Sequence, residues 1–295
     1  MSKVLSFIFA SAFVIVACNH SGASAIRPVD AARPPAELRS PEALSSAIAG
    51  TGVVTPAPIP SVGAFRPEAC PSGMVEINGD YCPELKETCL EWMAPDDHFR
   101  CKRFAKSECR GVTVRQRYCI DGYEYPNKPG QVPMVMVLWG QAQELCREQG
   151  KRLCSAREWT FACQGPNWLP YPYGSERESN ACRIDLGGKE PRWADAAAGG
   201  YGRTPSPLKG QACVNFSKPS GTYPACVSAF GVHDMTGNVD EWVSSDGSPN
   251  GASWLKGGWW GNLRNRCGSE ATTTGHDKSY SGIQVGFRCC SDVTR

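Results

Sequence analysis

Cysteine content constrains the fold of this chain more than any other feature of its sequence. Sixteen cysteines occur in 295 residues, yet there is no CxxC pair and no cysteine–histidine cluster at the spacing of a zinc site. Disulfides persist in exported proteins and are rare in a reducing cytosol. The cysteine content therefore predicts an exported domain that is held together by disulfides.

The N-terminal residues indicate how the chain is exported. Residues 4–16 form an apolar run that is too short for a membrane span. The run leads into IVAC at 15–18, which resembles a bacterial lipobox, where small residues admit the peptidase and the cysteine takes the lipid. We expect residues 1–18 to be a lipoprotein signal peptide and Cys18 to be the lipidated residue. This places the protein at a bacterial cell envelope, on the outer membrane or the periplasmic face, with the lipid as its only membrane contact.

An ordinary signal peptide cleaved near Ala17 or Ala25 is the alternative, and it also takes the protein out of the cytoplasm. Residues 19–66 are rich in alanine, proline and serine and poor in large apolar side chains. Such a segment cannot bury enough surface to offset its ordering entropy, so we expect a disordered tether. Residues 67–295 remain for one folded domain.

The overall composition favours short strands and loops. The chain has 31 glycines, 23 prolines and 9 tryptophans, a mixture typical of loop-rich folds. Its 31 basic residues against 29 acidic ones give no charge excess that would attract nucleic acid.

Local patterns predict a few regular elements. Residues 74–77 have the pattern of a short strand, and Asn78-Gly79 is a typical turn. Further brief strands are expected around 253–258 and 285–290, with mostly loops after Pro166.

Two helices are expected between these strands. The first has Trp139, Ala142, Leu145 and Cys146 at helical spacing and Gly150 at its end. The second opens on the capping-box pattern Ser155-x-x-Glu158 and carries Trp159, Ala162 and Cys163 on one side.

Six cysteines concentrate between residues 70 and 119. We expect the part between Cys82 and Cys109 to be an elaboration that is closed by its own bridges. Six cysteines allow fifteen pairings, and the sequence does not choose among them. The six are Cys70, Cys82, Cys89, Cys101, Cys109 and Cys119.

The stretch 231–243, GVHDMTGNVDEWV, is too polar for a buried strand and too rich in glycine for a helix. It brings four oxygen-bearing side chains into eight residues, with Gly237 allowing a tight turn; they are Asp234, Asn238, Asp240 and Glu241. A turning, oxygen-rich loop matches the needs of calcium, which binds carboxylates and backbone carbonyls together. An acidic surface turn is the alternative interpretation.

An ordered series of motifs surrounds this loop. GKRL at 150–153, Glu158-Trp159 and PYPYG at 170–174 precede it, while KGG at 256–258 and GFRC at 286–289 follow it. In this order and spacing, residues from about 70 to 290 resemble the sulfatase-modifying-factor family, that of formylglycine-generating enzyme. The resemblance implies an α+β fold with a C-type-lectin-like core, little regular secondary structure and several disulfides.

The resemblance also implies disulfide pairs. It ties the first helix to the GFRC strand, as Cys146–Cys289, and the second helix to the segment after KGG, as Cys163–Cys267. Cys154 and Cys290 lie beside the first pair, which makes a third bridge between them plausible. Three cysteines then remain, and if Cys18 is lipidated at least one thiol is free or joined to another molecule; the three are Cys182, Cys213 and Cys226.

Active members of the family oxidise a substrate cysteine with copper that is held by two cysteines soon after KGG. Here Asn262 occupies the first of these positions, and Cys267 matches either the second or a structural cysteine further along. Copper(I) requires soft sulfur ligands, which an amide does not replace. We therefore expect no copper-dependent oxidation, and Cys267 is the single candidate catalytic residue.

Other family members are iron-dependent sulfoxide synthases that rely on histidines of an additional domain. This chain has four histidines and no HxxxH pair, and we expect the one in the loop, His233, to be structural. The family's calcium ligands map onto four residues of the same loop: Asp234, the carbonyls of Gly237 and Val239, and Glu241. Arg183 replaces an asparagine of a second calcium site, so one calcium is expected.

Aromatic residues allow two interpretations. Trp139, Trp254, Trp259, Trp260 and the PYPYG tyrosines either pack in the core or line a cleft for an extended peptide, protein segment or glycan. The preferred prediction is a non-catalytic binding or scaffolding module, stabilised by calcium and disulfides. The alternative is an oxidoreductase of divergent mechanism that acts on a secreted protein or a small substrate.

Overall fold

A computed structural model describes most of the chain after residue 68. The described residues are 69–97, 100–186, 203–205, 212–214, 217–245, 250–261, 265–268, 270–271 and 277–294. The predicted signal peptide with Cys18, the predicted tether 19–66 and Asn262 lie outside these ranges. Among the helices that the structure describes, none combines the length and the apolar content needed to cross a membrane.

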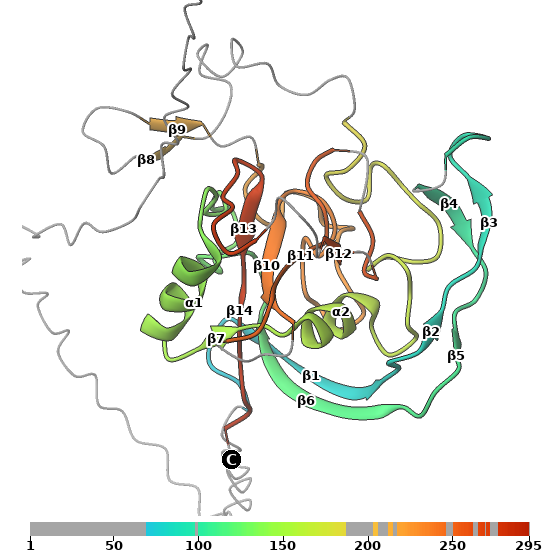
Figure 1. The fold of residues 1–295 in the computed structure, drawn as a ribbon, viewed down its shortest axis with the longest axis horizontal. Helices are drawn as coiled ribbons and strands as arrows, with labels where there is room; N and C mark the ends of the chain where they lie inside the picture. The colour runs from blue at the N-terminus through green and yellow to red at the C-terminus, as the bar shows by residue number, and fades with distance from the viewer. Residues whose placement is uncertain are drawn as a thin grey trace, which may run out of the picture. The chain divides into compact units, whose positions relative to one another are not determined.

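The first sheet joins both ends of the described domain. Its strand order is β1-β6-β14-β7, and every neighbouring pair is antiparallel. The strands are β1 (Met74–Tyr81), β6 (Val114–Asp121), β14 (Cys289–Ser291) and β7 (Arg152–Leu153). Figure 1 shows β1 and β6 running together along one edge of the domain.

The turn predicted at Asn78-Gly79 is wrong, because both residues lie inside β1. Asn78 pairs with Arg117 and Gly79 with Gln116 in a ladder that continues to Tyr81. Pairing along the whole length of β6 overrides the local turn signal. Gly79 has a packing role instead: a Cβ there would stand 3.0 Å from the ring of Phe161.

The second sheet includes Lys256, the first residue of KGG, and Gly286-Phe287, the first half of GFRC (Figure 1). Its order is β12-β11-β10-β13, with β10 and β13 parallel and the other pairs antiparallel. The strands are β12 (Glu270–Ala271), β11 (Ser253–Lys256), β10 (Asp240–Ser244) and β13 (Val285–Phe287). All five residues of β10 are buried, so the expectation that 231–243 is too polar for a buried strand is wrong for its second half.

Both predicted helices are confirmed. Helix α1 (Trp139–Glu148) buries Trp139, Ala142 and Cys146, and Gly150 follows its end with φ of 70°. Helix α2 (Ala156–Gln164) begins at the capping box, in which Ser155 accepts a hydrogen bond from the Glu158 amide. The Glu158 carboxylate in turn accepts one from the Ser155 amide at 2.8 Å. Gly165, with φ of 66°, ends this helix.

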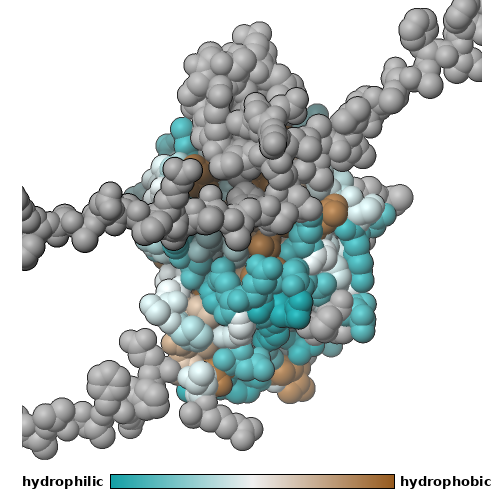
Figure 2. Space-filling view, turned by 90° about the vertical axis from the view of Figure 1, so that its left-hand side faces the viewer, coloured by the Kyte–Doolittle hydropathy of each residue, from teal (hydrophilic) through white to brown (hydrophobic). Residues whose placement is uncertain are grey.

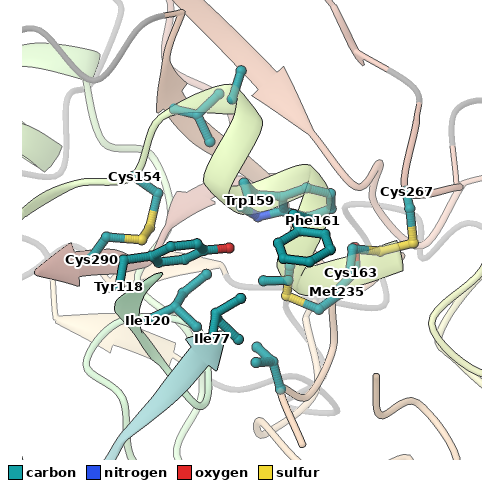
Figure 3. Close-up of a cluster of buried hydrophobic side chains, with 14 residues drawn as sticks. Ile77, Tyr118, Ile120, Cys154, Trp159, Phe161, Cys163, Met235, Cys267 and Cys290 are labelled. Atoms are coloured by element: carbon teal, nitrogen blue, oxygen red, sulfur yellow. A yellow bond between two sulfur atoms is a disulfide. The ribbon is translucent and has the colours of Figure 1, made fainter. Parts of the chain in front are cut away.

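Disulfides fasten these elements around the core. Two of them flank the apolar cluster of Tyr118, Trp159 and Phe161 on opposite sides, as Figure 3 shows. Seven bridges are formed among the described residues, and none of those cysteines is free. They are Cys70–Cys119, Cys82–Cys109, Cys89–Cys101, Cys146–Cys289, Cys154–Cys290, Cys163–Cys267 and Cys182–Cys226.

The cysteine-rich segment continues outward from β1 and β6 (Figure 1). Two short ladders form it: β2 (Leu85–Lys86) with β5 (Glu108–Cys109), and β3 (Cys89–Trp92) with β4 (Cys101–Phe104). Its own bridges are Cys82–Cys109 and Cys89–Cys101, so the segment is closed internally as expected. We call residues 82–109 the extension. A separate ladder pairs β8 (Arg203–Pro205) with β9 (Ala212–Val214).

The surface is mainly polar where it is described. In Figure 2 hydrophobic residues form small separate patches between hydrophilic ones. The exposed large hydrophobic residues lie in the extension or just after it, and they are Leu90, Trp92, Met93, Val112 and Val114.

Candidate functional site

Cys267 is buried and bonded to Cys163 of α2. The sequence left this cysteine open to two interpretations, a copper ligand or a structural cysteine. In the structure it is structural, since a disulfide sulfur is not available as the thiolate that holds copper. Cys146–Cys289 is also formed, as the resemblance implied, and so is Cys154–Cys290, which was expected from the position of these two cysteines beside that pair.

Residues 231–243, where calcium was predicted and which we call the cation loop, are built around a buried ion pair. The Glu241 carboxylate accepts hydrogen bonds from Arg288 Nε and Nη2, both at 2.7 Å, and from the indole of Trp159 at 2.7 Å. The Arg288 side chain is fully buried and also donates to the carbonyl of His233 at 2.9 Å. The arginine of GFRC thereby neutralises the glutamate that was predicted as a calcium ligand.

Two more buried carboxylates lie near this pair. Glu124 accepts hydrogen bonds from Ser220 Oγ and from Asn238 Nδ2, and Asp234 accepts one from the Gly221 amide at 2.7 Å. Burial, and next the charge of Asp234, raises the pKa of Glu124 well above its usual range. Burial raises the pKa of Asp234 to about 6. Glu124 carries no recognisable signal in the sequence, because it lies more than a hundred residues before the loop.

The backbone of the loop makes the tight turn that was predicted at Gly237. Gly237 has φ of 78°, and a Cβ there would stand 2.2 Å from the Arg183 carbonyl oxygen, so no other residue fits. Asn238, with φ of 58°, accepts a hydrogen bond from the Lys218 amide through its side chain. The loop is therefore fixed by a close approach to residue 183 and by a side-chain brace to residue 218.

The chemistry of this region fits a cation in part. Three buried carboxylates, those of Glu124, Asp234 and Glu241, act on the buried guanidinium of Arg288, and a divalent ion would offset negative charge that this arginine leaves. Glu241 already accepts three N–H donors, which leaves about one of its four lone-pair positions. No group of three or more Asp, Glu, His or Cys side chains in the described ranges is placed to hold a metal. A cation here depends on the carbonyls of Gly237 and Val239.

The remaining predicted site residues have packing roles. The His233 ring stacks on Tyr123 with centroids 4.8 Å apart, and burial lowers its pKa. The aromatic residues fall into separate clusters: Trp139 of α1 packs in the cluster of Trp242, Trp254 packs in the cluster of Trp159, and Trp259 lies with Trp260 and Leu186. The tyrosines of PYPYG stack on each other at 5.5 Å. The arrangement favours core packing over a single aromatic-lined cleft.

A polar cavity lies where the extension meets the core, and nothing in the sequence pointed to it. Its volume is about 400 Å³. We call it the Glu87–Gln164 pocket, after one residue of the extension and the last residue of α2. It is lined by Tyr81, Cys82, Pro83, Leu85, Glu87, Thr160, Gln164, Lys256, Arg266 and Gly268. No local pattern identifies the pocket, because its lining residues come from four distant segments of the chain.

Comparison with known proteins agrees with the motif series. The model of the "Sulfatase-modifying factor enzyme 1-like domain" matches residues 78–293. "Inactive C-alpha-formylglycine-generating enzyme 2" of Mus musculus is 30% identical over 173 residues, which cover 56% of this chain and 51% of that protein. The protein of the same name from Bos taurus is 29% identical over 174 residues, covering 56% and 52%. The chain thus spans about half the length of these relatives.

Two further comparisons are more distant. "Formylglycine-generating enzyme" of Mycobacterium tuberculosis is 29% identical over 119 residues, which cover 40% of this chain and 34% of that protein. Among solved structures, PvdO from Pseudomonas aeruginosa is 21% identical, with a TM-score of 0.45 over 74% of this chain and 94% of that one.

Proposed function

Because the chain belongs to the sulfatase-modifying factor enzyme 1-like family, we propose that it is a non-catalytic binding or scaffolding module for a peptide, protein or glycan. The observation that supports this most is the bond between Cys267 and Cys163. It removes the one sulfur that remained for a copper site, and Asn262 stands where the other ligand would be. Two relatives whose names include the word inactive point the same way.

Copper binding tests this proposal. The purified oxidised protein is titrated with Cu(I), and we expect no tight one-to-one complex. Cys267→Ser is compared with Cys101→Ser, which breaks a bridge of the extension and serves as the matched control. One-to-one binding that Cys267→Ser alone abolishes would instead support an oxidoreductase acting on a secreted protein or a small substrate.

Calcium is the second part of the proposal. The ion would be held by Asp234, by the carbonyls of Gly237 and Val239, and by the remaining lone pair of Glu241. Its support is the excess of buried carboxylates around Arg288. Calcium should raise the melting temperature relative to EDTA, because a ligand that binds only the folded state stabilises it. An Asp234→Ala variant should lose this increase, and an unchanged melting temperature in the wild type would rule the ion out.

The third part is anchoring at a bacterial cell envelope through Cys18. The lipobox-like residues 15–18 support it. Metabolic labelling with a radioactive fatty acid should mark the wild-type chain and leave Cys18→Ala unmarked. A wild-type chain that is exported without label would indicate the ordinary signal peptide.

A further inference from the structure

We propose that the Glu87–Gln164 pocket binds a small carboxylate that also carries amine or hydroxyl groups, such as an amino acid or a sugar acid. The assignment rests on the binding role proposed above and gives it a site and a ligand class. This site is separate from the cation loop and from the aromatic residues that the sequence singled out.

Two acceptor atoms on residues that line the pocket have no hydrogen-bond donor among the residues that the structure describes. They are Oε1 of Gln164, a residue that is 3% exposed, and Oε1 of the partly buried Glu87. The other Glu87 oxygen lies 2.6 Å from Arg266 Nη1. A buried acceptor without a donor costs free energy, so natural proteins leave few of them. Two in one cavity indicate a ligand that brings N–H or O–H groups.

Two cations complete the wall. Lys256 is 2% exposed, with its ammonium 5.8 Å from the Trp159 ring centre, and Arg266 reaches the pocket from the segment beside Cys267. Both act electrostatically on Glu87. The described lining thus carries one carboxylate and two cations, which attract a negatively charged group. A purely cationic ligand would meet repulsion from Lys256 and Arg266.

The size of the cavity limits the ligand. A volume of about 400 Å³ is near the lower end of the range of about 300–1,000 Å³ that is typical of small-molecule sites. The lining contains one aromatic residue, Tyr81, whose ring already packs edge-on against Phe161 with centroids 5.9 Å apart. Recognition therefore depends on charge and hydrogen bonds, which favours an acid over a neutral sugar.

The pocket wall is rigid on both sides. Gln164 belongs to α2, which the Cys163–Cys267 bridge holds beside Arg266, and Glu87 belongs to the extension, which Cys82–Cys109 closes. Gly268 lies against the Glu87 carboxylate, since a Cβ there would stand 3.3 Å from Glu87 Oε2. The two unpartnered acceptors are therefore fixed in place before a ligand arrives, which lowers the ordering cost of binding.

Isothermal titration calorimetry with the purified full chain tests the proposal. The probes are L-glutamate and D-glucuronate, with D-glucose as the neutral control. We expect saturable binding of at least one acid and none of glucose. Gln164→Met should weaken binding of the acid by about tenfold to a hundredfold, the worth of a hydrogen bond to a charged group. The matched control, Gln131→Met, replaces an exposed glutamine and should bind as the wild type does.

Two further measurements are the stability of Gln164→Met and the binding of both acids to Glu87→Gln. Gln164→Met should unfold at the same denaturant concentration as the wild type or a higher one, because the replaced carbonyl has no partner to lose. Glu87→Gln should weaken the binding of glutamate more than the binding of glucuronate, because glutamate brings an ammonium group and glucuronate brings hydroxyls. This difference identifies which kind of acid the pocket prefers.

Three results overturn the proposal: neither acid binds, glucose binds as well as the acids, or Gln164→Met binds as the wild type does. Any of them leaves the copper titration unaffected. The pocket assignment and the proposed non-catalytic role therefore fail separately.

Discussion

Removing Arg288 tests the ion pair on which the cation loop is built. Arg288→Met keeps much of the side-chain volume but leaves the Glu241 carboxylate buried with only the Trp159 indole as donor. It also removes the donor of the His233 carbonyl. Breaking a buried ion pair by deleting one partner costs about 3–5 kcal/mol. For a domain of this size that corresponds to a decrease in melting temperature of about 6–20 °C.

The assay is guanidinium and thermal unfolding of the oxidised protein in EDTA, so that calcium does not replace the lost charge. Arg117→Met is the matched control, because its pair with Glu76 is 2.7 Å long but half exposed, and it should cost about 0–1 kcal/mol. Adding Glu241→Gln to Arg288→Met should restore part of the loss, since the charge of residue 241 is then no longer left buried without its partner. The reasoning is refuted if Arg288→Met costs no more than the control, or if the double variant is less stable than the single one.

Three further predictions follow from other residues. Gly237→Ala should destabilise the domain by about 2–4 kcal/mol in chemical unfolding, because residue 237 has a positive φ and the new Cβ would stand 2.2 Å from the Arg183 carbonyl oxygen. The control is Gly140→Ala in α1, where a Cβ has nothing within 4 Å, and it should stabilise the domain by about 0.5–1 kcal/mol. Replacing Cys163 and Cys267 together by alanine should cost about 2–5 kcal/mol in the same assay, because the bridge closes a separation of 104 residues. A double variant as stable as the wild type would contradict a structural role for the bridge. Burial raises the pKa of Glu87 above its ordinary 4.5. Relative to Glu87→Gln, the wild-type domain should therefore be most stable below pH 4.5 and should lose this advantage as the pH rises through the raised pKa. Unfolding measured between about pH 4 and pH 7 should show this loss, and the opposite trend would mean that the pairing with Arg266 dominates.

The helices were predictable because their signals are local. The Ser155–Glu158 capping box and the helical spacing of Trp139, Ala142 and Cys146 are set by residues within a few positions of one another. The Asn78-Gly79 turn was predicted by the same kind of local signal and failed, because β6 pairs with β1 along its whole length. A local pattern carries no information on the partner strand.

In the candidate site, too, local features were predictable and contacts between distant residues were not. The resemblance placed Asp234, Gly237 and Glu241 in one loop, and Gly237 indeed makes the tight turn. It did not show that Glu241 is bound to Arg288 or that Glu124 lies beside the loop, since those contacts join residues 47 and 114 positions apart. The polarity of β10 was misread for this reason, because a buried charge is acceptable once a distant partner neutralises it.

Strand β14 carries two consecutive cysteines that fasten different parts of the interior. Successive residues of a strand face opposite sides, so Cys289 joins α1 in one apolar cluster while Cys290 joins Cys154 in the other. Their partners lie 143 and 136 residues earlier in the chain. In the export that we propose, those earlier thiols would reach the oxidising compartment well before residues 289 and 290. Correct sulfur pairing must therefore wait for the last strand, and any bond that Cys146 or Cys154 makes sooner has to be exchanged before the domain is finished.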